Sequence, residues 1–168
     1  MTILSRGGSL GHTALRPEKE QYQTTKAQML AQLDVAMGGR VAEEMIFGED
    51  KITSGAYSDL RNATAIAKRM VKYFGMSDRV GLAVHESRDK FYNETSNSMQ
   101  ELIDNEIKLL LQESYERAKS LLKDREKELH LIAKALLDHE TLDANQIRKI
   151  LKGEKLDLEK SNSEKLSN

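Results

Sequence analysis

Apolar residues recur every three or four positions along most of this chain, and this spacing limits the possible folds more than any other feature. The repeat is clearest from Met99 to Leu122, where apolar residues would line one side of a helix and charged residues the other. Similar repeats predict helices over residues 26–47, 54–74, 129–137 and 143–151. The sequence therefore predicts a mainly α-helical fold.

The composition agrees with such a fold. The chain has 168 residues, a single proline, and 32% charged against 5% aromatic residues, which is typical of helices with charged solvent faces. This length suits one domain, which we expect over residues 1–156. From Gly153 onward no apolar face is large enough to offset the entropy of ordering, so residues 157–168 are predicted to form a flexible tail.

Hydroxyl residues and glycines predict where the first two helices begin and end. Thr24 or Thr25 would cap the first helix, and Ser54 would cap the second. Gly48 and Gly75 stand where these helices would stop, as glycine often does after the last helical residue.

Three segments fit the helical pattern less well. Gly38 and Gly39 lie inside the first predicted helix, where each glycine costs about 1 kcal/mol of helix stability relative to alanine. We therefore expect a neighbouring backbone to pass close to them. The glycines among residues 1–13 disfavour a helix, and we expect a short β-strand or hairpin over Ile3–Thr13. Residues 80–84 could pair as a strand or form an ordered loop.

Charge and cysteine content exclude several classes of function. Lysine and arginine number 26 and aspartate and glutamate 27, so a net charge of -1 gives no general attraction to nucleic acid. The absence of cysteine excludes disulfides, thiolate catalysis and cysteine-rich zinc sites, and leaves His, Asp and Glu as possible metal ligands. No run of about 18 apolar residues exists, so we expect this chain to be soluble. Gly7, Gly8 and Gly11 are not followed by a phosphate-loop lysine, which disfavours nucleotide binding.

Histidine spacing offers no complete zinc motif. The motif H-E-x-x-H works because two imidazoles one helical turn apart hold zinc while the glutamate activates water, and this sequence does not contain it. His85-Glu86 begins like it, but Asp89 stands where the second histidine would be. We expect His130 and His139 to be surface or boundary residues.

Asp59 has two interpretations. A carboxylate in the first turns of a helix usually compensates the helix dipole, and Asp59 lies there in the second predicted helix. The same helix carries a stripe of alanines, beside which an inward-facing carboxylate would need a cation, a hydrogen bond or a metal ion. The residues alone leave both interpretations open.

The sequence contains six stretches that together carry a family resemblance: RGGSLGHT at residues 6–13, MGGRVAEEMIFG at 37–48, TSGAYSDL at 53–60, GMS at 75–77, SYERA at 114–118 and TLDA at 141–144. In this order and spacing they resemble the peptidase domain of FtsH-type ATP-dependent zinc metalloproteases. The likeness covers residues 1 to about 156, and within the family the residues of these motifs are most similar to those of the mitochondrial i-AAA proteases.

The resemblance implies a site and a cellular setting. In that family the aspartate corresponding to Asp59 is the third protein ligand of a zinc ion, and it would point into a cleft bordered by the Ile3–Thr13 strand. That strand would bind an extended substrate along its edge. Glu43 and Glu44 would be supporting residues that hold the site in place without binding the zinc ion themselves. The substrate-binding residues would be Gly7, Gly8, Ser9, Leu10 and Gly11.

The whole enzyme of that family is a homo-hexamer with an ATPase ring. It degrades unfolded or membrane-associated proteins at the mitochondrial inner membrane, on the intermembrane-space side, where an N-terminal segment anchors it. Such an enzyme would use zinc in its peptidase ring and ATP only through its ATPase module. No nucleic acid is expected as a partner.

The chain departs from the family pattern at the most important point. The family's H-E-x-x-H lies upstream of the segment that matches Ile3–Thr13, and neither that motif nor an ATPase module is present here. With Asp59 as the only remaining ligand, we expect an incomplete zinc site and no hydrolysis by this chain alone. The alternative is a catalytically inactive assembly or regulatory module of the protease hexamer.

Overall fold

The computed structural model describes residues 1–4, 11, 13, 23–86 and 95–154. The described part is mainly helical, which confirms the predicted fold class. Its helices are α1 (Lys26–Phe47), α2 (Tyr57–Lys72), α3 (Asn97–Asp124), α4 (Glu126–His139) and α5 (Ala144–Leu151), with short 3₁₀ turns η1 (Glu49–Lys51) and η2 (Ser54–Ala56). None of these helices combines the length and the apolar composition needed to cross a bilayer.

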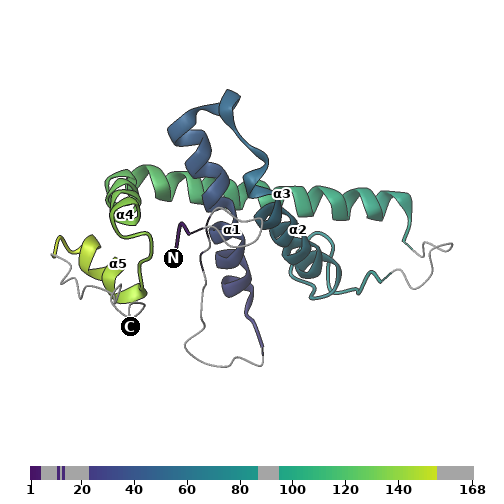
Figure 1. Cartoon of the computed structure of the whole chain (residues 1–168). Helices are drawn as coiled ribbons and strands as arrows, with labels where there is room; N and C mark the ends of the chain where they lie inside the picture. Colours follow the sequence, from purple (N-terminus) through teal and green to yellow (C-terminus); the bar gives the residue numbers. More distant parts are fainter. Residues whose placement is uncertain (5–10, 12, 14–22, 87–94, 155–168) are drawn as a thin grey trace, which may run out of the picture. The chain divides into compact units, whose positions relative to one another are not determined.

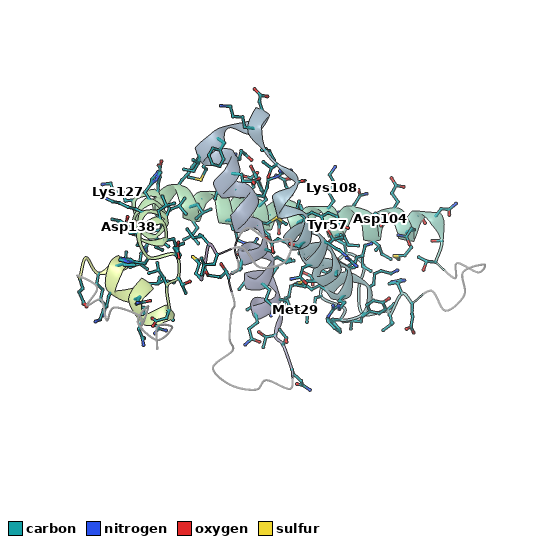
Figure 2. The ribbon with its side chains drawn as sticks, in the orientation of Figure 1. Met29, Tyr57, Asp104, Lys108, Lys127 and Asp138 are labelled. Carbon is teal, nitrogen blue, oxygen red and sulfur yellow. The ribbon has the colours of Figure 1, made fainter. Side chains whose placement is uncertain are left out.

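The chain divides into two compact units. One unit comprises residues 20–124 and holds α1, α2 and α3, each of which packs against the other two, with α1 running across α3 (Figure 1). Its core is apolar: Met29, near the start of α1, is buried, whereas Tyr57 at the start of α2 is 68% exposed (Figure 2). The fully buried large side chains of this core are Leu33, Val41, Met70, Val71 and Ile103.

Both predicted ends of the first helix are confirmed. The Thr25 side chain accepts a hydrogen bond from the backbone N–H of Gln28, and the Gln28 side chain accepts one from the backbone N–H of Thr25. This reciprocal pair satisfies two N–H groups that the helix itself cannot bond. At the other end Gly48 has a φ of 85°, a backbone conformation that glycine adopts without strain.

Two local predictions were wrong. Thr53 rather than Ser54 is the capping residue before α2, because the Thr53 hydroxyl accepts the hydrogen bond from the N–H of Gly55. Gly38 and Gly39 were expected to face a close backbone, yet no described backbone atom outside α1 lies within 4 Å of the place a Cβ would take on either residue.

The segment after α2 is an ordered loop rather than a strand in the residues described. Gly75 has a φ of 58° and turns the chain out of the helix. The Ser77 hydroxyl donates a 2.8 Å hydrogen bond to the buried Glu106 carboxylate on α3, and Arg79 forms a 3.0 Å ion pair with the other oxygen of the same group. These bonds tie the loop to α3.

The other unit joins residues 1–19 to residues 125–168. It contains α4 and α5, which pack together, and Asp143, where the last helix was predicted to begin, caps α5 by accepting a hydrogen bond from the Gln146 N–H. Thr2 pairs with Thr141 in an isolated antiparallel bridge, flanked by a 2.9 Å bond from the Leu142 N–H to the Met1 carbonyl. Most of the strand predicted over Ile3–Thr13 lies outside the described residues.

Candidate functional site

Asp59 lies in the first turn of α2, and its side chain is exposed to solvent. One carboxylate oxygen is 3.8 Å from the position that a Cβ would take on Gly39, so the group lies beside α1. Within the described residues, no hydrogen bond or ion pair reaches this carboxylate. An exposed oxygen donor with no described partner suits either a helix dipole or a metal ion.

The turn that leads into α2 is held by two residues of α1. The Glu43 carboxylate accepts a 2.6 Å hydrogen bond from the Thr53 hydroxyl and a 3.3 Å bond from the Thr53 N–H. From the same helix, an Arg40 guanidinium nitrogen donates a 3.3 Å bond to the Thr53 carbonyl oxygen. Glu43 was predicted to support the site, but Arg40 and Thr53 were not, although Arg40 and Glu43 stand three positions apart on one helical face.

This bonding changes the acidity of Glu43. The Thr53 hydroxyl and then the Thr53 N–H donate to the carboxylate, and the positive charge of Arg40 adds to their effect, so that the pKa of Glu43 lies below its usual value. The carboxylate is therefore ionised at neutral pH and acts as a fixed acceptor.

Glu44, the next residue, turns to a different partner. Its carboxylate accepts hydrogen bonds from the Tyr115 hydroxyl and, at 2.6 Å, from the Lys119 ammonium, both on α3. The Lys119 bond, followed by the Tyr115 bond, lowers the pKa of Glu44. The Lys119 nitrogen also lies 5.3 Å from the centre of the Tyr115 ring, within the range of a cation–π contact. Glu44 therefore joins α1 to α3, and the hydrogen bonds described for its carboxylate go to α3 and not to Thr53.

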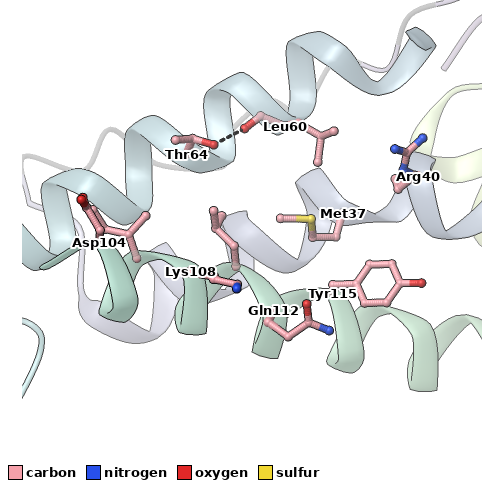
Figure 3. A pocket seen from close by; sticks show the side chains of 10 residues that line it. Met37, Arg40, Leu60, Thr64, Asp104, Lys108, Gln112 and Tyr115 are labelled. Atoms are coloured by element: carbon pink, nitrogen blue, oxygen red, sulfur yellow. Dashed lines mark hydrogen bonds between the residues drawn. The ribbon is translucent and has the colours of Figure 1, made fainter. Parts of the chain in front are cut away.

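A hollow of about 410 Å³ lies between the three helices of this unit (Figure 3). Met37 of α1, Leu60 of α2 and Tyr115 of α3 line it from three sides. Arg40 is also part of the lining, and the Thr64 hydroxyl there donates a 2.8 Å bond to the Leu60 carbonyl. Asp59 does not line this hollow, although Leu60, its neighbour in sequence, does.

The predicted substrate-binding residues are mostly outside the described part of the chain. Gly7, Gly8, Ser9 and Leu10 fall there, and only Gly11 is described. A Cβ on Gly11 would lie 2.9 Å from the Thr2 carbonyl oxygen, so the chain turns back on itself too closely there for a larger residue. Substrate binding by this segment stays a prediction.

The described histidines lie in different environments. His130 is exposed, with its ring 3.8 Å from Glu126, and His139 is half-buried, as expected of surface or boundary residues. His85 is half-buried in the loop after α2, and its Nε2 has no hydrogen-bond partner among the residues that the structure describes. Among the described residues no three His, Cys, Asp or Glu side chains gather closely enough to hold a metal ion.

The chemistry of the donors fits zinc in part. Zinc in proteins takes four ligands, and a catalytic site supplies three from the protein, often two imidazoles and a carboxylate. Asp59 can supply the carboxylate, since no described residue competes for it. The two imidazoles would have to come from residues outside the described part.

Comparison with known proteins identifies the family. The model of peptidase family M41 matches residues 1–150. A Caenorhabditis elegans protein named "ATP-dependent zinc metalloprotease YME1 homolog" is 53% identical over 161 residues, which cover 93% of this chain and 22% of that protein. The human "ATP-dependent zinc metalloprotease YME1L1" is 53% identical over 157 residues, 94% of this chain and 20% of its own length.

A third relative adds a location. The Saccharomyces cerevisiae "Mitochondrial inner membrane i-AAA protease supercomplex subunit YME1" is 47% identical over 156 residues, 93% of this chain and 20% of that protein. This chain therefore spans about a fifth of the length of the curated relatives it matches. The resemblance drawn from the motifs is confirmed, and the chain belongs to peptidase family M41, the FtsH-type zinc metalloproteases.

Proposed function

We propose that this chain forms part of an ATP-dependent zinc metalloendopeptidase that degrades unfolded or membrane-associated proteins, and that Asp59 is one of the zinc ligands. The observation that carries the proposal is the Asp59 carboxylate itself, which is exposed, unpaired among the described residues and placed after a turn bonded to α1. The names of the relatives support zinc and ATP as the cofactors of the longer proteins.

The chemistry divides between the metal and the chain. When bound, zinc polarises the scissile carbonyl and lowers the pKa of a bound water, so that hydroxide is available at neutral pH. Asp59 contributes a negative charge and an oxygen ligand. The segment Gly7–Gly11 would hold an extended substrate by backbone hydrogen bonds, as an added strand does.

The setting of the activity is also a proposal. The yeast relative is named as a subunit of a supercomplex of the mitochondrial inner membrane, which supports the same membrane for this protein. The resemblance of this chain to the i-AAA proteases is our reason for proposing the intermembrane-space side. A homo-hexamer with an ATPase ring would deliver unfolded proteins to the peptidase domains. The sequence holds no H-E-x-x-H, so we expect the 168-residue chain alone to cleave nothing.

A hybrid protein tests the role of Asp59. In the Caenorhabditis elegans relative, the matching span is replaced by this chain, and zinc affinity and ATP-dependent degradation of casein are measured. We expect Asp59→Asn to lower zinc affinity by more than the roughly 10- to 100-fold that follows loss of a supporting residue, and to abolish casein degradation. Its ATPase activity should remain, which shows that the hybrid is folded.

Asp50→Asn is the matched control, since Asp50 is an exposed aspartate of the turn η1 before α2. It should bind zinc and degrade casein like the parent hybrid. Full zinc affinity and full casein degradation in the Asp59→Asn hybrid would refute the proposal and favour a non-catalytic assembly module.

A further inference from the structure

Two adjacent glutamates of α1 take part in separate networks, and one network ends at the turn before Asp59. Glu43 bonds the Thr53 hydroxyl and N–H, whereas Glu44 bonds Tyr115 and Lys119 of α3. Arg40 reaches the opposite side of the same residue, at the Thr53 carbonyl oxygen. All three hydrogen-bonding groups of Thr53 are therefore held by α1.

The network extends from Thr53 into the start of α2. The Thr53 hydroxyl accepts a 3.1 Å bond from the Gly55 N–H, which is one of the first amides of the turn η2. The hydroxyl thus donates to Glu43 and accepts from Gly55 at the same time. Alternating bonds of this kind fix the orientation of every group in the chain of bonds.

Gly55 fits closely against the same side chains. A Cβ added there would lie 3.2 Å from the Thr53 hydroxyl oxygen and 3.5 Å from a Glu43 carboxylate oxygen. The turn therefore leaves little room for any residue but glycine beside the carboxylate. The helix α2 begins two residues later, at Tyr57, and Asp59 is in its first turn.

We propose that Arg40 and Glu43 are positioning residues: they hold Thr53 from both sides, fix the turn Thr53–Ala56, and thereby set the place of the Asp59 carboxylate at the zinc site. The inference rests on the proposed function of Asp59, and it assigns no such role to Glu44. A ligand held in place before the metal arrives loses less conformational freedom on binding, which raises metal affinity.

The first test uses the 168-residue chain without metal. Amide hydrogen exchange at Gly55, followed by NMR, reports whether the Thr53 hydroxyl still accepts its bond. We expect faster exchange in Thr53→Val, which removes the hydroxyl. We also expect faster exchange in Glu43→Gln, which weakens the hydrogen bond that orients this hydroxyl toward the Gly55 N–H. Thr53→Ser keeps the hydroxyl and should retain slow exchange, and so should Glu44→Gln, which changes only the bonds to α3.

The second test uses the hybrid with the Caenorhabditis elegans relative and measures zinc affinity. Thr53→Val and Glu43→Gln should lower the affinity roughly 10- to 100-fold, while Thr53→Ser and Glu44→Gln stay within about twofold of the parent. Unchanged affinity in Thr53→Val, in a hybrid whose affinity falls with Asp59→Asn, would overturn the positioning role and leave the proposed function standing. An Asp59→Asn hybrid with full zinc affinity would overturn both.

Discussion

The carboxylates of α1, α2 and α3 meet three different environments. Asp59 is exposed and has no partner among the described residues, whereas Glu43 accepts two bonds from Thr53. Glu106 is buried, and it accepts bonds from Ser77 and Arg79. A buried carboxyl group is stable only where hydrogen-bond partners in the protein replace its hydration. The Asp59 carboxylate, which has no partner among the described residues, is the group that we propose as a zinc ligand, and the Glu106 carboxylate holds the loop after α2.

Removing the Ser77 hydroxyl should destabilise the unit of residues 20–124. Ser77→Ala leaves a Glu106 oxygen and the Val80 N–H, 3.3 Å from the hydroxyl, without their partner. A buried group left unsatisfied costs about 1–3 kcal/mol, so we expect a loss of that size in the free energy of unfolding, measured in urea.

The control for this variant is Ser120→Ala on the exposed side of α3. It deletes a solvent-exposed hydroxyl and should change the free energy of unfolding by no more than about 0.5 kcal/mol. Equal losses in the two variants would show that the Ser77 bond adds nothing beyond the general effect of the substitution.

The contact between α1 and α3 combines apolar packing with two polar links. Asp34 of α1 accepts bonds from two nitrogens of Arg117, the shorter at 2.9 Å, and ten residues along the same helix Glu44 bonds Lys119 and Tyr115. Arg117 also donates to the fully buried Ser114 hydroxyl. The links hold α1 at one position along α3.

The Glu44 link should make stability depend on pH. Because the pKa of Glu44 is lowered from its usual 4.5, its stabilisation is present above about pH 4.5 and is lost as pH falls through the folded-state pKa. The pKa of Lys119 is raised, mainly by the bond to Glu44, so its share is lost only as pH rises beyond the usual lysine value of 10.5.

Glu44→Gln should therefore flatten the fall in the free energy of unfolding on the acid side of pH 4.5, as followed by circular dichroism in urea at several pH values. Glu101→Gln, at an exposed site on α3, should leave the acid limb of the curve unchanged. An acid limb equally steep in Glu44→Gln and the parent would contradict this assignment.

Helices could be predicted from the sequence because their signal is local. Apolar residues recur every three or four positions, and a cap such as Thr25 lies next to the helix that it begins. The polar links could not, because Glu43 and Thr53 are 10 residues apart and Ser77 and Glu106 are 29 apart. No periodic pattern records which side chain a distant carboxylate meets. Asp59 was found through the family motif, and its free carboxylate became visible only in the structure.

At the scale of the whole molecule, the proposed site depends on the packed core of α1, α2 and α3. Asp59 and the residues proposed to position it all belong to the unit of residues 20–124, and α1 contributes both to the core and to the turn before α2. Substitutions of core residues would therefore move the Asp59 carboxylate even where the substituted residue does not contact it. Two nearby positions on α1, one buried and one exposed, test how much this core contributes to the free energy of unfolding.

Leu33 and Val35 lie two residues apart on α1, yet Leu33 is fully buried and Val35 is 62% exposed. Leu33→Ala removes apolar volume from the shared core and should lower the free energy of unfolding by about 2–5 kcal/mol. Val35→Ala removes a largely solvated side chain and improves helix propensity, so its effect should stay within about 0.5 kcal/mol. Urea midpoints followed by circular dichroism measure both, and a Val35→Ala loss as large as that of Leu33→Ala would mean that Val35 is covered in solution.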